Sequence, residues 1–216
     1  MKNRFDLIIF DWDGTLIDSI DWIAKCLQNA AKYCHLPIPE SQAAKDVIGL
    51  SIKKAMETLF PDTDDTVQQQ LVASYSHEYH AKQISKTDLF PGVYDMLVHL
   101  NRGGYQLAVA TGKNRAGLQK ALQATETEEL FCTTRCADET ASKPDPKMLN
   151  EILRHTKIAN ERTLMVGDSI HDLQMAVNAQ ISFVAVSCGA HTEEFLLQHH
   201  PLLCLQNPAQ LLAYLR

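Results

Sequence analysis

The sequence predicts an α/β fold: a doubly wound, Rossmann-like parallel sheet that carries an inserted all-helical domain. Three observations favour this class. Short apolar runs recur along the chain, segments with helical periodicity lie between them, and one connection is far longer than a simple crossover. The runs do not alternate with polar residues, which is typical of parallel strands covered on both faces.

Short runs that are mostly apolar predict the strands, and the run at residues 132–136 is the least apolar of them. The clear candidates are residues 6–11, 106–111, 163–167 and 182–187, and the weaker candidates are residues 132–136 and 202–205. Apolar residues at helical spacing predict the helices that cover the sheet, over residues 92–101, 115–123, 146–155, 172–179, 193–199 and 209–215. Because strands and helices alternate, neighbouring strands are expected to run parallel.

The connection between the first two strands is too long for one crossover, since a whole strand–helix–strand unit takes roughly 30 residues. Ser19 is placed to cap a helix with an apolar face, and residues 51–60 and 66–80 show the same periodicity. We therefore expect two domains, an α/β core of residues 1–18 and 87–216 and a helical domain of residues 19–86.

Composition narrows the class of protein. Of the 216 residues, 45% are hydrophobic, and 20 basic residues against 26 acidic ones give a net charge of −6. Such a chain can bury a core, and it lacks the basic excess typical of nucleic-acid binding. The apolar run of residues 7–10 is too short for a signal peptide or a membrane span. We expect a cytoplasmic protein without nucleic-acid or membrane partners, whose oligomeric state composition does not predict.

The first candidate site is the segment DWDGT at residues 11–15, directly after the first strand. Ligands bind open α/β sheets outside the carboxyl ends of the strands, so both carboxylates are placed for chemistry there. Asp11 is a candidate nucleophile. Asp13 is a candidate general acid that protonates a leaving oxygen and then activates water. The alternative is a polar turn without a catalytic role.

Two further segments supply groups that suit a phosphate. Thr111 and Gly112 end the second strand, where a hydroxyl and a free backbone N–H can hold a phosphate oxygen. Lys143 precedes Pro144, so it is expected to be extended and to neutralise negative charge at close range. Taken singly, each segment also fits an ordinary turn or a solvent-exposed loop.

More carboxylates follow the predicted strand at residues 163–167. Asp168, with Asp11 and the backbone carbonyl of Asp13, offers the oxygen ligands that Mg²⁺ prefers. Asp172 is expected nearby, as a ligand through water or as the residue that orients Ser169. Alternatively, Asp168 and Asp172 are acids that favour a helix N-terminus.

The combination of these segments is more informative than any one of them. Phosphoryl transfer needs a nucleophile, an acid–base group, a cation and donors that hold phosphate, and each occurs at a predicted strand end. Carboxylates this close would repel, and one would keep its proton, unless a divalent cation lay between them. The sequence therefore predicts a Mg²⁺-dependent enzyme that hydrolyses a small phosphate monoester through a phosphorylated Asp11.

These segments resemble those of the haloacid dehalogenase-like hydrolases. The resemblance covers essentially the whole chain and rests on DWDGT at residues 11–15, Thr111, Lys143 within SKPDP, and GDSIHD at residues 167–172. It implies that Asp11 is the nucleophile and Asp13 the acid and base. It also implies that Thr111 and Lys143 hold the phosphate and that Asp168 completes the Mg²⁺ site. The helical domain resembles the small cap of the phosphoglycolate phosphatase-like branch.

Asp13 also distinguishes chemistries within that family. Dehalogenases lack an acid at this position and phosphonate hydrolases have a small residue there, so the aspartate favours cleavage of a C–O–P linkage. A phosphomutase that returns the phosphate to a sugar uses the same residues and stays open as an alternative. A non-catalytic, phospho-accepting module is less consistent, because it needs neither the helical domain nor a general acid beside Asp11.

The helical domain is expected to close over the site and to supply specificity. Gly49, Leu50 and Ser51 lie at a break between two of its helices, where a glycine lets a loop approach the substrate. Lys53 follows as a candidate contact for an anion, although a plain helix start with solvated lysines fits equally. The partner is expected to be a small phosphorylated metabolite, and phosphoglycolate, a nucleotide, pyrophosphate and a sugar phosphate all fit the sequence.

Overall fold

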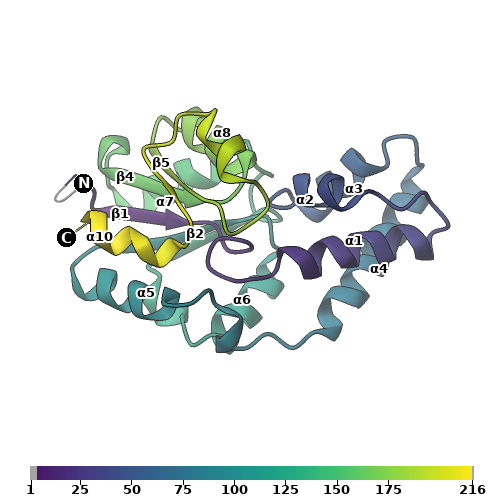
Figure 1. Cartoon of the computed structure of the whole chain (residues 1–216), viewed down its shortest axis with the longest axis horizontal. Coiled ribbons are helices and arrows are strands. Elements are labelled where there is room, and N and C mark those ends of the chain that lie inside the picture. The colour runs from purple at the N-terminus through teal and green to yellow at the C-terminus, as the bar shows by residue number, and fades with distance from the viewer. Residues whose placement is uncertain (1–3, 216) are drawn as a thin grey trace.

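A six-stranded parallel sheet forms the centre of the computed structural model, which describes residues 4–215 (Figure 1). The strand order is β3-β2-β1-β4-β5-β6, and neighbouring strands pair in parallel. The strands are β1 Leu7–Phe10, β2 Gln106–Thr111, β3 Thr133–Cys136, β4 Thr163–Gly167, β5 Ser182–Val186 and β6 Cys204–Leu205. The predicted α/β fold is confirmed, and strands form at both of the weaker candidates.

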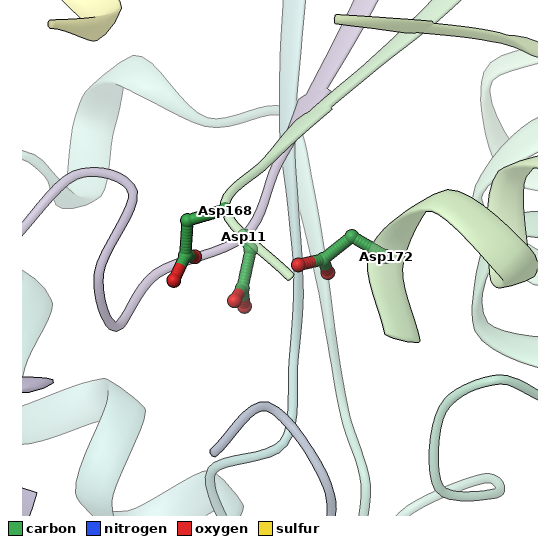
Figure 2. Close-up of side chains that lie close together, drawn as sticks. All are labelled: Asp11, Asp168 and Asp172. Atoms are coloured by element: carbon green, nitrogen blue, oxygen red, sulfur yellow. The ribbon is translucent and has the colours of Figure 1, made fainter. Parts of the chain in front are cut away.

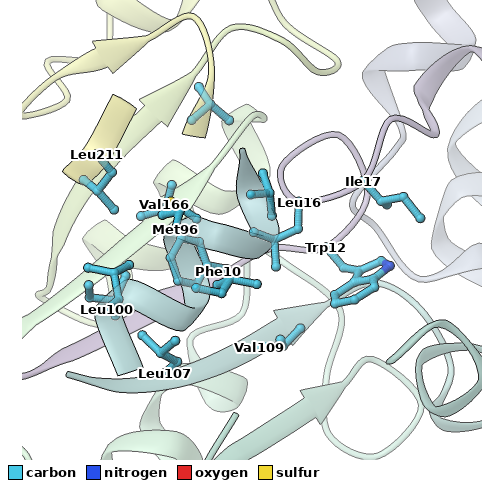
Figure 3. Packing of buried hydrophobic residues seen from close by; sticks show 14 of the residues in the cluster. Phe10, Trp12, Leu16, Ile17, Met96, Leu100, Leu107, Val109, Val166 and Leu211 are labelled. Carbon is cyan, nitrogen blue, oxygen red and sulfur yellow. The ribbon is translucent and has the colours of Figure 1, made fainter. Parts of the chain in front are cut away.

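Helices cover both faces of the sheet. Alternate residues of β1 point to opposite faces, so Ile8 and Phe10 join one hydrophobic cluster while Leu7 and Ile9 join another. The first cluster includes side chains of α5, α6 and α10, and Figure 3 shows part of it around Phe10. The second includes side chains of α7, α8 and α9. The helices are α5 Val93–Arg102, α6 Arg115–Ala124, α7 Lys147–Thr156, α8 Ile170–Asn178, α9 Glu193–Leu197 and α10 Leu212–Leu215, with 3₁₀ turns at Lys86–Asp88, Glu128–Leu130, Asn160–Arg162 and Pro208–Leu211.

Between β1 and α5 the chain forms a separate helical layer beside the carboxyl ends of the strands (Figure 1). Its helices are α1 Ile20–Tyr33, α2 Ser41–Asp46, α3 Ile52–Leu59 and α4 Asp65–Ala81. Buried side chains such as Leu27, Met56 and Leu71 make a third hydrophobic cluster within it. The domain boundaries predicted from the sequence, with residues 19–86 as the helical domain, stay a proposal. None of the helices described in residues 4–215 is long and apolar enough to cross a membrane.

The helix predicted over residues 209–215 is α-helical only from Leu212, after the 3₁₀ turn at Pro208–Leu211. Helices α2 and α8 also differ from the sequence prediction. The short helix α2 was not predicted, because only Ala44 of its six residues is buried and it has no apolar stripe to recognise. Helix α8 begins at Ile170, earlier than predicted. Ser169 caps it by accepting a hydrogen bond from the Asp172 N–H, while the Asp172 carboxylate accepts one from the Ser169 N–H. Asp172 is therefore fixed in the first turn of α8.

The register of the sheet brings the ends of three strands together. β1 lies between β2 and β4, and its last residue, Phe10, is opposite Val109 and Val166. The residues that follow these strands therefore emerge at one edge of the sheet, which faces the helical layer (Figure 1). The acids, hydroxyl and lysine singled out in the sequence are found around this edge.

Candidate active site

Three buried aspartates meet at this edge of the sheet. Asp11 follows β1, Asp168 follows β4, and Asp172 lies in the first turn of α8. One carboxylate oxygen of each lies within 4.8 Å of those of the other two. Figure 2 shows Asp11 between the other two residues, with the carboxylate of Asp172 directed toward it. The fold thus gathers acids from two segments that are far apart in the sequence.

Both oxygens of Asp168 are held by other segments. The Thr15 hydroxyl donates to Oδ1 and the Ala190 N–H donates to Oδ2, each at 2.7 Å. Glycines make room for this carboxylate, because a Cβ at Gly14 would lie 2.3 Å from Oδ2 and one at Gly189 would lie 2.1 Å from it. Burial, together with the charge of Asp172, raises the pKa of Asp168 to about 7. The ionised form therefore needs a positive charge nearby.

Lys143 brings one positive charge to the cluster. Its side chain is fully buried, and its Nζ lies 2.7 Å from Asp11 Oδ1 and 2.6 Å from Asp172 Oδ1. Burial opposes the charge, but the two carboxylates outweigh it and raise the pKa of Lys143 above its ordinary value. The alternative of a solvent-exposed loop lysine is wrong. Asp172 also accepts a hydrogen bond from Ser169 Oγ at 2.6 Å, so it links Ser169 to Lys143.

The cluster still carries excess negative charge, since three carboxylates share this one ammonium group. Burial raises the pKa of Asp11 well above the usual range, the Lys143 charge lowers it, and the charges of Asp172 and Asp168 raise it again. Although Asp11 Oδ1 is buried and lies beside Lys143, no aligned hydrogen-bond donor reaches it within the described residues. An all-oxygen donor set with excess negative charge fits a hard divalent cation such as Mg²⁺.

The side chain of Asp13 is bound to a second cation. The Lys113 Nζ donates to both of its oxygens, at 2.9 Å and 2.7 Å, and the Ser19 hydroxyl donates to Oδ1 at 2.7 Å. Ser19 is the N-cap residue of α1, as predicted, but its hydroxyl is directed to Asp13 and makes no capping hydrogen bond. Lys113 also donates to the Tyr79 hydroxyl at 2.5 Å, which connects Asp13 to α4. Lys113 directly follows Thr111 and Gly112 in the segment that was predicted to bind phosphate, but its pairing with Asp13 was not predicted, and Tyr79 was not predicted to belong to the site.

A family model described as "Haloacid dehalogenase-like hydrolase" matches residues 8–186, which span the arrangement from Asp11 to Asp172. The chain belongs to the haloacid dehalogenase-like hydrolases. The predicted resemblance is thereby confirmed.

Two curated relatives and a solved structure are similar to this hydrolase. It is 32% identical to "Probable phosphatase IndB" of Dickeya dadantii, over 90% of this chain and 86% of that protein. It is 27% identical to "Pyrophosphatase PpaX" of Halalkalibacterium halodurans, over 97% of this chain and 96% of that one. The crystal structure of a predicted phosphoglycolate phosphatase from Haemophilus somnus shares the fold, with a TM-score of 0.85 and 23% identity over 97% of both chains.

In this hydrolase the loop between α2 and α3 packs against the core. A Cβ at Gly112 would lie 2.4 Å from the carbonyl oxygens of Gly49 and Leu50, so the loop can approach this closely only because residue 112 is glycine. The Ser51 N–H donates to Ser142 Oγ at 2.8 Å, beside the loop that carries Lys143. The loop that was predicted to approach the substrate is thus in contact with both segments predicted to bind phosphate.

A cavity of about 90 Å³ lies between the core and this helical layer. Its core side includes the two aspartates of the DWDGT segment and the turn after β2, and its other side includes the loop before α3. The predicted site residues that line it are Asp11, Asp13, Thr111, Gly112, Gly49 and Leu50. Lys53 does not line it. The Lys53 side chain is 83% exposed and lies 3.9 Å from Glu57, so its predicted contact with a substrate anion has no support in the geometry.

Proposed function

We propose that this hydrolase is a Mg²⁺-dependent phosphatase that cleaves a small phosphate monoester through a phosphate transiently bound to Asp11. The observation that carries the proposal is the buried pair of Asp11 and Lys143 at the end of β1, with Asp11 in the wall of the cavity. A carboxylate that is held by a cation and faces a cavity is placed to attack phosphorus. The phosphatase names of two relatives support the reaction class.

The proposed chemistry divides between two aspartates. Asp11 attacks phosphorus and forms an acyl phosphate, while the bond from phosphorus to the leaving oxygen breaks and Asp13 gives that oxygen a proton. Asp13 then takes a proton from water, and the water oxygen attacks phosphorus. The acyl phosphate bond breaks, so inorganic phosphate leaves and Asp11 and Asp13 return to their starting states.

Other residues hold the phosphate and balance its charge. The Thr111 hydroxyl and the Gly112 N–H are candidates to bind phosphate oxygens, and Lys143 offsets the charge of the phosphoryl group. Asp172, itself hydrogen-bonded by Ser169, keeps Lys143 in place. The residues that would hold Mg²⁺ are Asp11, Asp168 and the backbone carbonyl of Asp13, with Asp172 nearby. Bound Mg²⁺ would offset the negative charge that phosphate and carboxylates share.

The helical domain has a supporting role in this proposal. Residues 19–86 act as a cap, and the loop of Gly49, Leu50 and Ser51 closes the cavity over the phosphate site. Closure would exclude water from the first step and would bring Tyr79 to the Lys113–Asp13 pair. The contacts between this loop and the core support a closed arrangement.

Release of inorganic phosphate from a panel of phosphate monoesters tests this function. We expect release with Mg²⁺, none with EDTA, and none from an Asp11→Asn variant that keeps the wild-type circular dichroism spectrum. Full activity in Asp11→Asn would contradict the mechanism. Isomerised sugar phosphate without released phosphate would instead favour the phosphomutase.

A further inference from the structure

The cavity has two chemically different sides. Its core side carries the carboxylates and the turn after β2, whereas its cap side is largely apolar. The apolar side chains come from α1, α3, α4 and the preceding loops, and include Ile23, Leu27, Val47, Leu50, Ile52 and Tyr75. A phosphate monoester with its phosphorus beside Asp11 therefore places its leaving group among apolar side chains.

One wall of this apolar side is aromatic. The rings of Tyr75 and Tyr79, which are one helical turn apart on α4, stack with their centroids 5.7 Å apart. Aromatic and branched aliphatic side chains together present a flat, weakly polar surface. Such a surface suits a compact hydrocarbon group better than a chain of hydroxyls.

Within the described lining, the basic side chains already have partners. The ammonium of Lys113 is bound to both oxygens of Asp13 and to the Tyr79 hydroxyl. His80 is exposed, and its Nδ1 lies 2.7 Å from the Ser76 carbonyl oxygen. The core side adds the carboxylates of Asp11 and Asp13, which are paired with Lys143 and Lys113 and offer a second anion no favourable contact.

These features decide between classes of leaving group. A second carboxylate or phosphate would lose its hydration on this apolar side without gaining a cation that is free to bind it, whereas a small uncharged group would bury apolar surface. We infer that the substrates are phosphate monoesters of small uncharged alcohols with an alkyl or aryl body, and not compounds that carry a second anionic group. This inference rests on the proposed phosphatase activity and adds a substrate class to it.

A matched pair of substrates tests the inference. Isobutyl phosphate and phosphoglycolate share one heavy-atom skeleton, but two methyl groups of the first replace the carboxylate oxygens of the second. We expect kcat/KM of the wild-type enzyme with Mg²⁺ to be at least about tenfold higher for isobutyl phosphate, and phenyl phosphate to be preferred over pyrophosphate likewise. Equal or faster hydrolysis of phosphoglycolate or pyrophosphate, which carry a second anionic group, would overturn the inference and leave the proposed function intact. No hydrolysis of any of the four would contradict both.

A variant that adds a cation to the cavity should weaken this preference for the uncharged leaving group. Ile52 lines the cavity at the start of α3 and is only partly buried, so a lysine can be accommodated there. We expect Ile52→Lys to lower the ratio of kcat/KM for isobutyl phosphate over phosphoglycolate at least about tenfold. Thr58→Lys adds the same charge to an exposed position of the same helix and should leave the ratio unchanged. An unchanged ratio in Ile52→Lys, or an equal shift in both variants, would overturn the assignment of this pocket to the leaving group.

Discussion

Lys143 and Lys113 each neutralise a different aspartate of the site. Lys143 lies between Asp11 and Asp172, whereas Lys113 is bound to Asp13. Removing one member of a buried ion pair leaves the other charge uncompensated, so each lysine is expected to matter through its own partner. The proposed nucleophile, Asp11, and the proposed acid–base group, Asp13, can therefore be perturbed separately.

Lys113→Met tests the role of the second pair. We expect kcat to fall about 10²-fold with isobutyl phosphate, because Asp13 loses the ammonium group that helps to orient it as a general acid. The loss should be smaller with p-nitrophenyl phosphate, whose leaving group needs little protonation, so kcat is compared between the two substrates. Lys120→Met, at an exposed position of α6, is the control. An equal loss for both substrates would mean that Lys113 does not act through the acid function of Asp13.

Gly189→Ala tests the space around Asp168. The new Cβ would lie 2.1 Å from Asp168 Oδ2, so the carboxylate must move. We expect the Mg²⁺ concentration for half-maximal activity to rise about 10- to 100-fold, with a smaller change in kcat at saturating Mg²⁺. A Mg²⁺ titration of phosphate release measures both. An unchanged Mg²⁺ requirement would argue against Asp168 as a ligand.

The residues of the site could be predicted from the sequence only in part. Asp11, Thr111 and Asp168 each follow an apolar run, so the rule that parallel strands share a carboxyl edge was enough to bring them together. The roles of Lys113 and Tyr79 were missed, although Lys113 directly follows Thr111 and Gly112, because their pairing with Asp13 joins segments that are distant in the sequence.

Among the structural elements, the loop between α2 and α3 connects the helical layer to the core. Gly49 has a φ of +98°, a conformation that favours glycine, and its carbonyl oxygen packs against Gly112. The Ser51 N–H of the same loop donates a hydrogen bond to Ser142 Oγ. Closure of the cavity therefore depends on a glycine from each side.

Gly112→Ala is expected to prevent this closure. The added Cβ would lie 2.4 Å from the carbonyl oxygens of Gly49 and Leu50, and backbone atoms cannot rotate out of the way as a flexible side chain can. We expect kcat/KM to fall about 10²-fold, because displacement by about 1 Å disturbs the alignment of reacting groups. Steady-state kinetics measure the loss. Ser142→Ala removes one hydrogen bond without adding bulk and should have the smaller effect, and the reverse order would contradict this account.

For the whole molecule, apolar runs and their spacing predicted the sheet and most of its covering helices. Even the two-residue strand β6 Cys204–Leu205 fell within a predicted run. The helix α2 was not predicted, because its six residues are mostly exposed and carry no periodic apolar pattern. The packing of the helical layer onto the core could not be predicted from the sequence, apart from the close approach that Gly49 indicates, because it depends on contacts between distant segments.

The pH dependence of stability should reveal the acid cluster when no metal is bound. The pKa of Asp168 is about 7 in the folded protein, against an ordinary value of 3.8. The folded state therefore binds more protons between about pH 4 and pH 7, so the contribution of this group to the free energy of unfolding is lost as the pH rises through that window. Mg²⁺ favours the ionised carboxylates, so we expect it to raise Tm more at about pH 8 than at about pH 5. Thermal melts at the two pH values measure this difference. The same difference in an Asp168→Asn variant would contradict the assignment to Asp168.

The central claim, a phosphate carried by Asp11, is tested most directly by trapping it. Asp13→Asn removes the base that activates water, while p-nitrophenyl phosphate can still phosphorylate the enzyme without a general acid. After acid quenching, peptide mass spectrometry should find one phosphoryl group on the peptide that contains Asp11, with Mg²⁺ present and not with EDTA. The double variant with Asp11→Asn should carry none. No phosphoryl group on Asp11, or one on another residue, would contradict the account.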